Sequence, residues 1–179
     1  DAFGQALTLV YRVLFLFFAE ARGLVPLWHP IYRDRYSVQR LCDLAADPKA
    51  RGIWDSLQAV GRLAHSGCHA GTLRVTAYNG RLFAPATAPL VDLPHLSEDA
   101  ARDTLVSLST RPAPDGEGRQ RIAYRDLGVE QLGAVYETLL DYVPEVTRKP
   151  QRGRARPATT VTLRTGSGHA KAHGQLLHP

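Results

Sequence analysis

The sequence is organised around Ile122-Ala-Tyr-Arg-Asp-Leu-Gly-Val-Glu-Gln-Leu-Gly-Ala-Val-Tyr-Glu-Thr-Leu-Leu-Asp-Tyr-Val143. Apolar side chains recur in this segment every three or four residues, which would place them on one side of a helix: Val129, Leu132, Tyr136, Leu139, Leu140 and Val143. Asp126 can cap the start of this helix through its carboxylate, and Pro144 should end it because proline has no N–H to donate. The pattern predicts a core helix, with a close-packed neighbour at Gly133.

A second helical pattern covers residues 3–22. Its apolar run from Val13 to Phe18 is far shorter than the ~20 residues that cross a bilayer, and Arg12, Glu20 and Arg22 flank it closely. No basic leader followed by a cleavage site marks a signal peptide. This segment therefore predicts a buried helix. Glu20 and Arg22 are expected to cap a helix or pair at the surface, with a functional role as the alternative.

Three more helices are predicted between these two. Ser37 can cap a short helix through Ala46. Asp47-Pro48 resembles a helix start, with the aspartate as cap and the proline in the first turn, ahead of apolar residues at helical spacing: Ile53, Trp54, Leu57, Val60, Leu63 and Ala64. Ser97 can cap a helix through Ser109. With few strand patterns, the fold class is mainly α.

The segments between the helices predict turns. Asn79-Gly80 lies between Leu73–Tyr78 and Arg81–Phe83, and suits either a two-residue hairpin turn or a tight loop. Residues 84–96 are rich in proline and should be irregular. The composition of Arg111–Arg119 predicts an exposed loop. Ile31–Tyr36 alternates arginine with aromatic residues. It could form a phosphate-and-stacking surface, but a loop packed on a helix is the preferred interpretation.

The amino-acid sequences of three segments resemble those of a known protein family. Tyr124–Glu137 resembles the segment just before the methyltransferase domain of large bacterial adenine-specific DNA methyltransferases. Two further segments fit in the right order: Tyr11–Pro26 is similar to the family's helix "Y-R-ϕ-L-F-ϕ-x-F-A-E-x-R-x-L-L-P", and Tyr78–Phe83 to its "N-G-G-L-F" turn. The family includes fused restriction–modification enzymes and phage-exclusion (BREX-type) methyltransferases. The resemblance implies that the parent protein binds S-adenosylmethionine and double-stranded DNA.

The basic residues at the C-terminal end are concentrated in a stretch without any Asp or Glu. They are Arg148, Lys149, Arg152, Arg154, Arg156, Arg164 and Lys171. The whole chain has a net charge of +5, so the preceding residues are slightly acidic. A localised positive charge favours a polyanion, and we expect these seven side chains to contact the DNA backbone. The alternative is a solvated, disordered linker.

Thr159–Leu163 predicts a short strand, and Arg164-Thr-Gly-Ser-Gly168 follows it. A nucleotide-binding loop is one interpretation of the glycines, but no helix pattern follows. In the resembled family a short strand and a basic glycine turn lead into "R-K-x-x-G-x-ϕ-Y-T-P", which lies against the cofactor. Lys171, Gly174 and Pro179 match that pattern, and the resemblance makes Gly174 and Pro179 the expected cofactor contacts. Leu177 and His178 depart from the pattern, where the family has Tyr and Thr.

The residues that would perform catalysis are not in this sequence. The resemblance implies an Asn/Asp-Pro-Pro-Tyr/Phe loop and a glycine-rich cofactor loop, and neither occurs in these 179 residues. His65, Cys68 and His69 cluster, with Cys42 the other thiol, but they lack paired metal-ligand spacing and favour a helix end with loop histidines over zinc. We expect no catalytic residue and no metal site in this chain.

The composition suits a cytoplasmic globular protein. The chain is 44% hydrophobic and 22% charged, and its two cysteines form no disulfide framework. It begins with Asp1 and ends with a basic run, which suggests a fragment. Together these features predict a helical connector domain over residues 1–147 and a basic, partly disordered linker over residues 148–179 that leads into a methyltransferase domain. The alternative is a non-enzymatic helical interaction module with a flexible basic linker.

Overall fold

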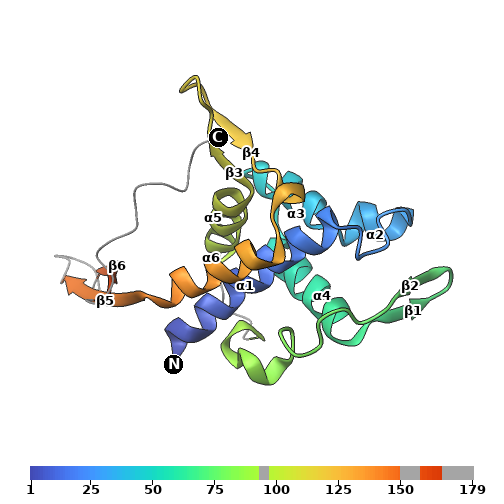
Figure 1. Cartoon of the computed structure of the whole chain (residues 1–179), viewed down its shortest axis with the longest axis horizontal. Helices are drawn as coiled ribbons and strands as arrows, with labels where there is room; N and C mark the ends of the chain where they lie inside the picture. Colours follow the sequence, from blue (N-terminus) through green and yellow to red (C-terminus); the bar gives the residue numbers. More distant parts are fainter. Residues whose placement is uncertain (93–96, 150–157, 167–179) are drawn as a thin grey trace. The chain divides into compact units, whose positions relative to one another are not determined.

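The computed structural model describes residues 1–92, 97–149 and 158–166. The chain divides into two compact units, Asp1–Leu132 and Gly133–Pro179. The first unit is mainly helical and carries two short hairpins (Figure 1). The second holds most of one helix and a two-stranded ribbon. The expected domain boundary after residue 147 falls inside a strand of that ribbon.

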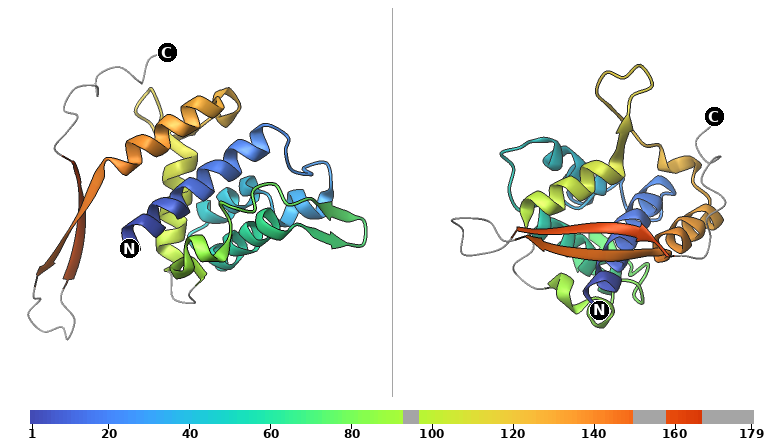
Figure 2. Two further views of the ribbon diagram at one scale, coloured as in Figure 1. Left: turned by 60° about the horizontal axis from the view of Figure 1, so that its bottom comes forward. Right: turned by 90° about the vertical axis from the view of Figure 1, so that its left-hand side faces the viewer.

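Helix α1 (Ala2–Ala21) is the central element of the first unit and confirms the helix predicted over residues 3–22. The Asp1 side chain caps it by accepting from the Phe3 N–H. It lies against α3 (Val38–Ala46) and α5 (Glu98–Ser109) (Figure 2), and its buried residues belong to the core of this unit. Helix α1 is long and apolar enough to cross a membrane. The core helix of a soluble protein often has the same length and composition, so this is weak evidence for a membrane span. The buried packing and the charged residues Arg12 and Glu20 favour the core helix.

Two helices follow the turn after α1. Helix α2 (Pro30–Arg35) is short and buries Tyr32 completely, so the Ile31–Tyr36 segment packs on the body as preferred, but as a helix. Helix α3 (Val38–Ala46) begins as predicted, because the Ser37 side chain accepts from the Arg40 N–H at 3.1 Å.

Helix α4 (Ile53–Ser66) begins later than the sequence predicts. Asp47 caps only a turn, by accepting from the Lys49 N–H, and the chain then passes through Gly52 at φ 78° before the helix starts. The carboxylate of Glu98 on α5 binds the first N–H groups of α4 instead. The cap therefore comes from a distant residue, which local sequence could not indicate.

Helix α5 (Glu98–Ser109) confirms the prediction, with Ser97 as its cap. The predicted apolar positions of α4 and α5 lie mostly in one core with α1 and α3. Between α4 and α5 the proline-rich segment forms two short 3-10 turns, η1 (Pro85–Thr87) and η2 (Pro89–Asp92).

The predicted hairpin at Asn79-Gly80 is wrong, and its tight-loop alternative holds. Strand β2 (Leu73–Val75) pairs with β1 (Cys68–Ala70), which precedes it, across a turn containing Gly71 at φ 59°. Asn79 instead closes a loop, because its side chain accepts from the Leu82 N–H. A second hairpin, β3 (Thr110–Pro112) with β4 (Arg119–Arg121), brackets the exposed loop expected there.

The segment 122–143 forms three elements where one helix was predicted. A 3-10 turn η3 (Tyr124–Asp126) comes first, so Asp126 is not the helix cap. Helix α6 (Val129–Leu140) starts where the Gly128 N–H donates to the Gln131 side chain at 2.6 Å. Leu132 is buried but Val129 is 66% exposed, so the apolar stripe does not form one core face. Among the described residues, Gly133 has no close neighbour of the predicted kind.

The second unit contains strands β5 (Tyr142–Lys149) and β6 (Ala158–Thr165), which pair antiparallel as a twisted ribbon (Figure 2). The strand predicted at Thr159–Leu163 is confirmed. Pro144 lies in β5 opposite Leu163 and does not end the helix. Pairing with β6 from Tyr142 onward, and the Gly166 N–H bound to the Asp141 carbonyl, hold this stretch extended.

Candidate functional site

Helix α1 brings together the three segments that carry the family resemblance. Buried Arg12 donates to the carbonyls of Leu82 and Ala84, each at 2.9 Å, and thereby holds the turn that contains Asn79-Gly80. Phe17 stacks on Tyr124, with ring centroids 4.6 Å apart and planes 9° from parallel. Tyr11–Pro26, the end of Tyr78–Phe83 and the start of Tyr124–Glu137 are therefore neighbours within the first unit.

Arg22, the residue that follows α1, contacts the start of the segment Tyr124–Glu137. Arg22 donates to the Leu127 carbonyl at 3.0 Å, and its guanidinium lies over the Phe18 ring, 5.5 Å from the centroid. This bonding agrees with the surface role expected for Arg22. The sequence did not predict that Arg12 binds the carbonyls of Leu82 and Ala84. Its only signal was a charged residue placed directly before the apolar run of the helix.

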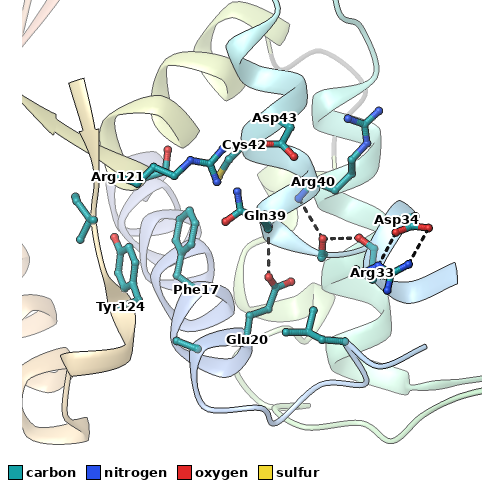
Figure 3. A pocket seen from close by; sticks show the side chains of 15 residues that line it. Phe17, Glu20, Arg33, Asp34, Gln39, Arg40, Cys42, Asp43, Arg121 and Tyr124 are labelled. Carbon is teal, nitrogen blue, oxygen red and sulfur yellow. Dashed lines mark hydrogen bonds and ion pairs between the residues drawn. The ribbon is translucent and has the colours of Figure 1, made fainter. Parts of the chain in front are cut away.

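An open cavity of about 650 Å³ lies beside α1, between α3 and the segment that follows β4 (Figure 3). Phe17 and Tyr124 form an aromatic part of its wall, and Glu20 and Gln39 add polar groups. Two surface ion pairs border it, Arg33 with Asp34 and Arg121 with Asp43. Exposed ion pairs of this kind contribute little stability, so the shape of the cavity rests on the packing beneath them.

Glu20 has the most perturbed carboxylate in this cavity. It accepts hydrogen bonds from the backbone N–H groups of Val38 and Gln39 at the start of α3, as the capping expectation predicted. Burial raises the pKa of Glu20 to about 7, and the two backbone hydrogen bonds offset part of that rise. Near neutral pH, Glu20 therefore exchanges between a charged cap and a neutral buried acid.

Two further groups that line the cavity, the Cys42 thiol and the Tyr124 hydroxyl, are held in unreactive states. Burial raises the pKa of the Cys42 thiol, so the thiol stays protonated and is a poor nucleophile. Burial also raises the pKa of Tyr124 to about 12, and its hydroxyl donates to the Leu108 carbonyl. Among the described residues that line the cavity, we find no nucleophile paired with a base. The arrangement suits binding or structural support.

The residues considered as zinc ligands belong to different elements of the fold. His65 sits at the end of α4 with Nδ1 2.8 Å from the Gly80 carbonyl, while Cys68 and His69 belong to β1 and Cys42 to α3. In the part of the chain that the structure describes, no group of three or more His, Cys, Asp or Glu side chains could hold a metal ion.

Few of the predicted DNA-contacting residues fall where the structure describes them. Arg164 lies on β6 and forms an ion pair with Glu145 of β5, at 2.8 Å between Nε and Oε2. Arg148 and Lys149 are the last residues of β5. The others lie outside the described residues, as do both expected cofactor contacts: Arg152, Arg154, Arg156, Lys171, Gly174 and Pro179.

Comparison with known proteins found no match to this chain among protein-family models, curated proteins or solved structures.

Proposed function

We propose that this chain is the connector region of an S-adenosylmethionine-dependent, adenine-specific DNA methyltransferase from a restriction–modification or phage-defence system. The observation that supports it is the convergence of the three resembling segments on α1. Arg12 and Phe17 belong to Tyr11–Pro26. Arg12 contacts Leu82 of the segment Tyr78–Phe83, and Phe17 contacts the first residue of Tyr124–Glu137.

The first unit has the properties of a rigid spacer. Charged side chains of one helix hold the ends of others: Glu20 binds the start of α3, and Glu98 binds the start of α4. Arg102 donates to carbonyls at and beyond the end of α3, including those of Ala45 and Ala50. Such ties fix the relative orientation of helices, because each charged group has one buried partner geometry. In the cytoplasm, this unit would position the catalytic domain on DNA.

In this proposal the DNA contact is to the phosphate backbone and carries no sequence information. The basic residues of 148–179 supply it, and the parent protein binds S-adenosylmethionine outside this chain. Of these residues Arg164 is described and exposed, so its guanidinium is available to a phosphate. Its partner Glu145 competes for that charge.

A second candidate, a non-enzymatic interaction module, is favoured by one side of the β5–β6 ribbon. Directly paired residues share a side of a two-stranded ribbon, so Val146 with Val161 and Pro144 with Leu163 form one apolar side. Val146, Val161 and Leu163 are each more than half exposed. An isolated hairpin is marginal in water, so an apolar partner would stabilise this one.

Salt dependence of duplex DNA binding separates the two candidates. For the connector, the affinity of the chain should fall steeply with added salt, by about 0.9 in the log–log slope for each phosphate contact. Replacing Arg152, Arg154 and Arg156 by Gln should reduce that slope by about 2 to 3. The matched control is Arg62→Gln, an exposed arginine on α4. An unchanged affinity in the triple variant would remove the DNA role of the linker.

The coding sequence around this chain gives an independent test. An open reading frame that continues into a glycine-rich loop and then Asn-Pro-Pro-Tyr would support the methyltransferase. A frame that encodes neither would leave the interaction module as the better proposal.

A further inference from the structure

The turn between α1 and α2 exposes an aromatic ring. Trp28 is 76% exposed, the largest value among the exposed large hydrophobic residues that the structure describes. Its ring forms a T-shaped contact with the neighbouring His29, with centroids 5.6 Å apart and planes at 66°. An indole ring that stays in water does not contribute the favourable free energy that its burial would give.

The backbone beneath this ring is firmly held. His29 is buried, and its Nε2 lies 3.2 Å from the Thr72 hydroxyl in the β1–β2 turn. The His29 N–H donates to the Pro26 carbonyl at 2.9 Å, and the His29 carbonyl accepts from Arg33 at 3.0 Å. Trp28 therefore stands on an ordered turn, so a ligand that stacks on it would not have to order the backbone first.

Positive charge exceeds negative charge on the following helices, where Arg33, Arg35 and Arg40 surround the single carboxylate of Asp34 and lower its pKa. Tyr32 faces the core, so α2 turns Arg33 and Arg35 outward, and Arg40 follows on α3. Arg33 is paired with Asp34. No hydrogen bond or ion pair joins the guanidinium of Arg35 or Arg40 to the described part of the chain. These two side chains line an open hollow of about 500 Å³ together with Pro30, Ile31 and Asp34, whose carboxylate is already paired with Arg33.

We propose that Trp28, Arg35 and Arg40 form a binding surface for single-stranded DNA, in which a base stacks on the indole and phosphates lie against the two guanidiniums. Aromatic platforms flanked by positive charge bind single strands in this way. A duplex does not fit, because base pairing and stacking cover the faces of its bases.

Size decides against a protein partner. The apolar part of this surface consists of one indole and the half-exposed side chain of Ile31. Stable protein interfaces bury about 800 Å² on each partner, and one indole with a neighbour supplies a fraction of that. The ring is, however, well matched to one nucleobase. The inference rests on the proposed function only for the choice of DNA over RNA.

The two tryptophans of the chain make a direct experiment possible. Trp54 is buried in the core, so in a Trp54→Phe variant the fluorescence comes from Trp28 alone. The probes are an oligothymidylate of about eight nucleotides and an abasic oligonucleotide of equal length and charge. The oligothymidylate should quench Trp28 and bind roughly ten-fold more tightly than the abasic strand. If Trp54→Phe fails to fold, the wild-type chain serves, because a Trp28→Leu variant then removes the quenched component.

Variants assign the two halves of the surface. Trp28→Leu should bind both oligonucleotides equally, since only the stacking is lost. Arg35→Gln with Arg40→Gln should reduce the log–log salt slope by about 1.4, the value for two phosphates on a single strand. Arg62→Gln, an exposed arginine on α4, is the control and should bind as the unmodified chain does.

Three results would overturn the inference: equal binding of the thymidylate and abasic strands, unchanged binding by Trp28→Leu, or equal quenching by polyglutamate. The last would point to an acidic protein segment instead. Failure here is distinguishable from failure of the proposed function. The linker variants Arg152→Gln, Arg154→Gln and Arg156→Gln test duplex binding, whereas the Trp28 and Arg35/Arg40 variants test binding of the single strand.

Discussion

The carboxylate of Glu20 on α1 accepts a hydrogen bond from the backbone N–H of Val38, the first residue of α3. The two residues are 18 positions apart, and the bond joins the end of one core helix to the start of another. Because burial raises the pKa of Glu20 to about 7, this joint should respond to pH.

The sign of the response follows from proton binding. The pKa of Glu20 rises on folding from 4.5 to about 7, so between these values the folded chain binds more protons than the unfolded chain. Its contribution to the free energy of unfolding therefore falls as pH rises, by on the order of 3 kcal/mol in total. In Glu20→Gln this pH dependence should disappear. Urea unfolding at pH 5 and pH 7.5 measures it.

The exposed carboxylate Glu137 gives the control for that experiment. Glu137→Gln should keep the pH dependence of the unmodified chain. If the stability difference between Glu20→Gln and the unmodified chain were equal at both pH values, the proposed protonation of Glu20 would be wrong.

Arg12→Met should destabilise the first unit by about 2 to 4 kcal/mol. The change keeps much of the side-chain length but leaves the carbonyls of Leu82 and Ala84, each now bound at 2.9 Å, without their donor. Thermal or urea unfolding measures the loss. Arg62→Met, on the exposed side of α4, should change stability by less than about 0.5 kcal/mol, and an equal loss in both variants would contradict the assignment.

Glu98→Ala should cost about 1 to 2 kcal/mol through loss of the cap on α4 rather than through α5. The Glu98 carboxylate accepts from the N–H groups of Ile53 and Trp54 at 3.0 and 3.3 Å. Asp99→Ala is the matched control, since Asp99 also lies in the first turn of α5 but is exposed. Hydrogen exchange localises the effect: amides of the first turn of α4 should exchange faster in Glu98→Ala and not in Asp99→Ala.

Tyr124→Phe should cost about 1 kcal/mol, because the stack on Phe17 stays and only the hydroxyl bond to the Leu108 carbonyl is lost. Tyr124→Leu should cost about 1 kcal/mol more by removing the stack. Because burial raises the pKa of Tyr124 to about 12, the tyrosinate absorbance at pH 11 should be nearly the same with and without this residue. A clear difference in absorbance would show that Tyr124 is accessible to solvent.

Glu145→Gln should strengthen binding of duplex DNA, by roughly two- to three-fold at low salt, if Arg164 contacts a phosphate. The change frees the Arg164 guanidinium from its exposed ion pair without altering the ribbon backbone. Arg164→Gln should weaken binding, and the double variant should behave as Arg164→Gln does. An increase in affinity that persists in the double variant would mean that Glu145 acts by general repulsion.

Local sequence determined the elements whose signals lie within a few residues. The caps at Ser37 and Ser97 and the apolar spacing of α1, α4 and α5 correctly predicted these helices, because capping and burial act at short range along the chain. The strand at Thr159–Leu163 was also correct, since branched residues in alternation suit a strand. The mainly helical class follows from these elements.

Tertiary structure decided what local signals left open. The start of α4 is set by Glu98, 45 residues from Ile53, and the role of Arg12 by carbonyls 70 and 72 residues away. Helix α6 ends early because β6 pairs with the residues that follow it. The cavity beside Glu20 depends in the same way on α1, α3 and the segment after β4. Partners this distant are brought together only by the packed core, so the sequence indicates the residues while the fold assigns their contacts.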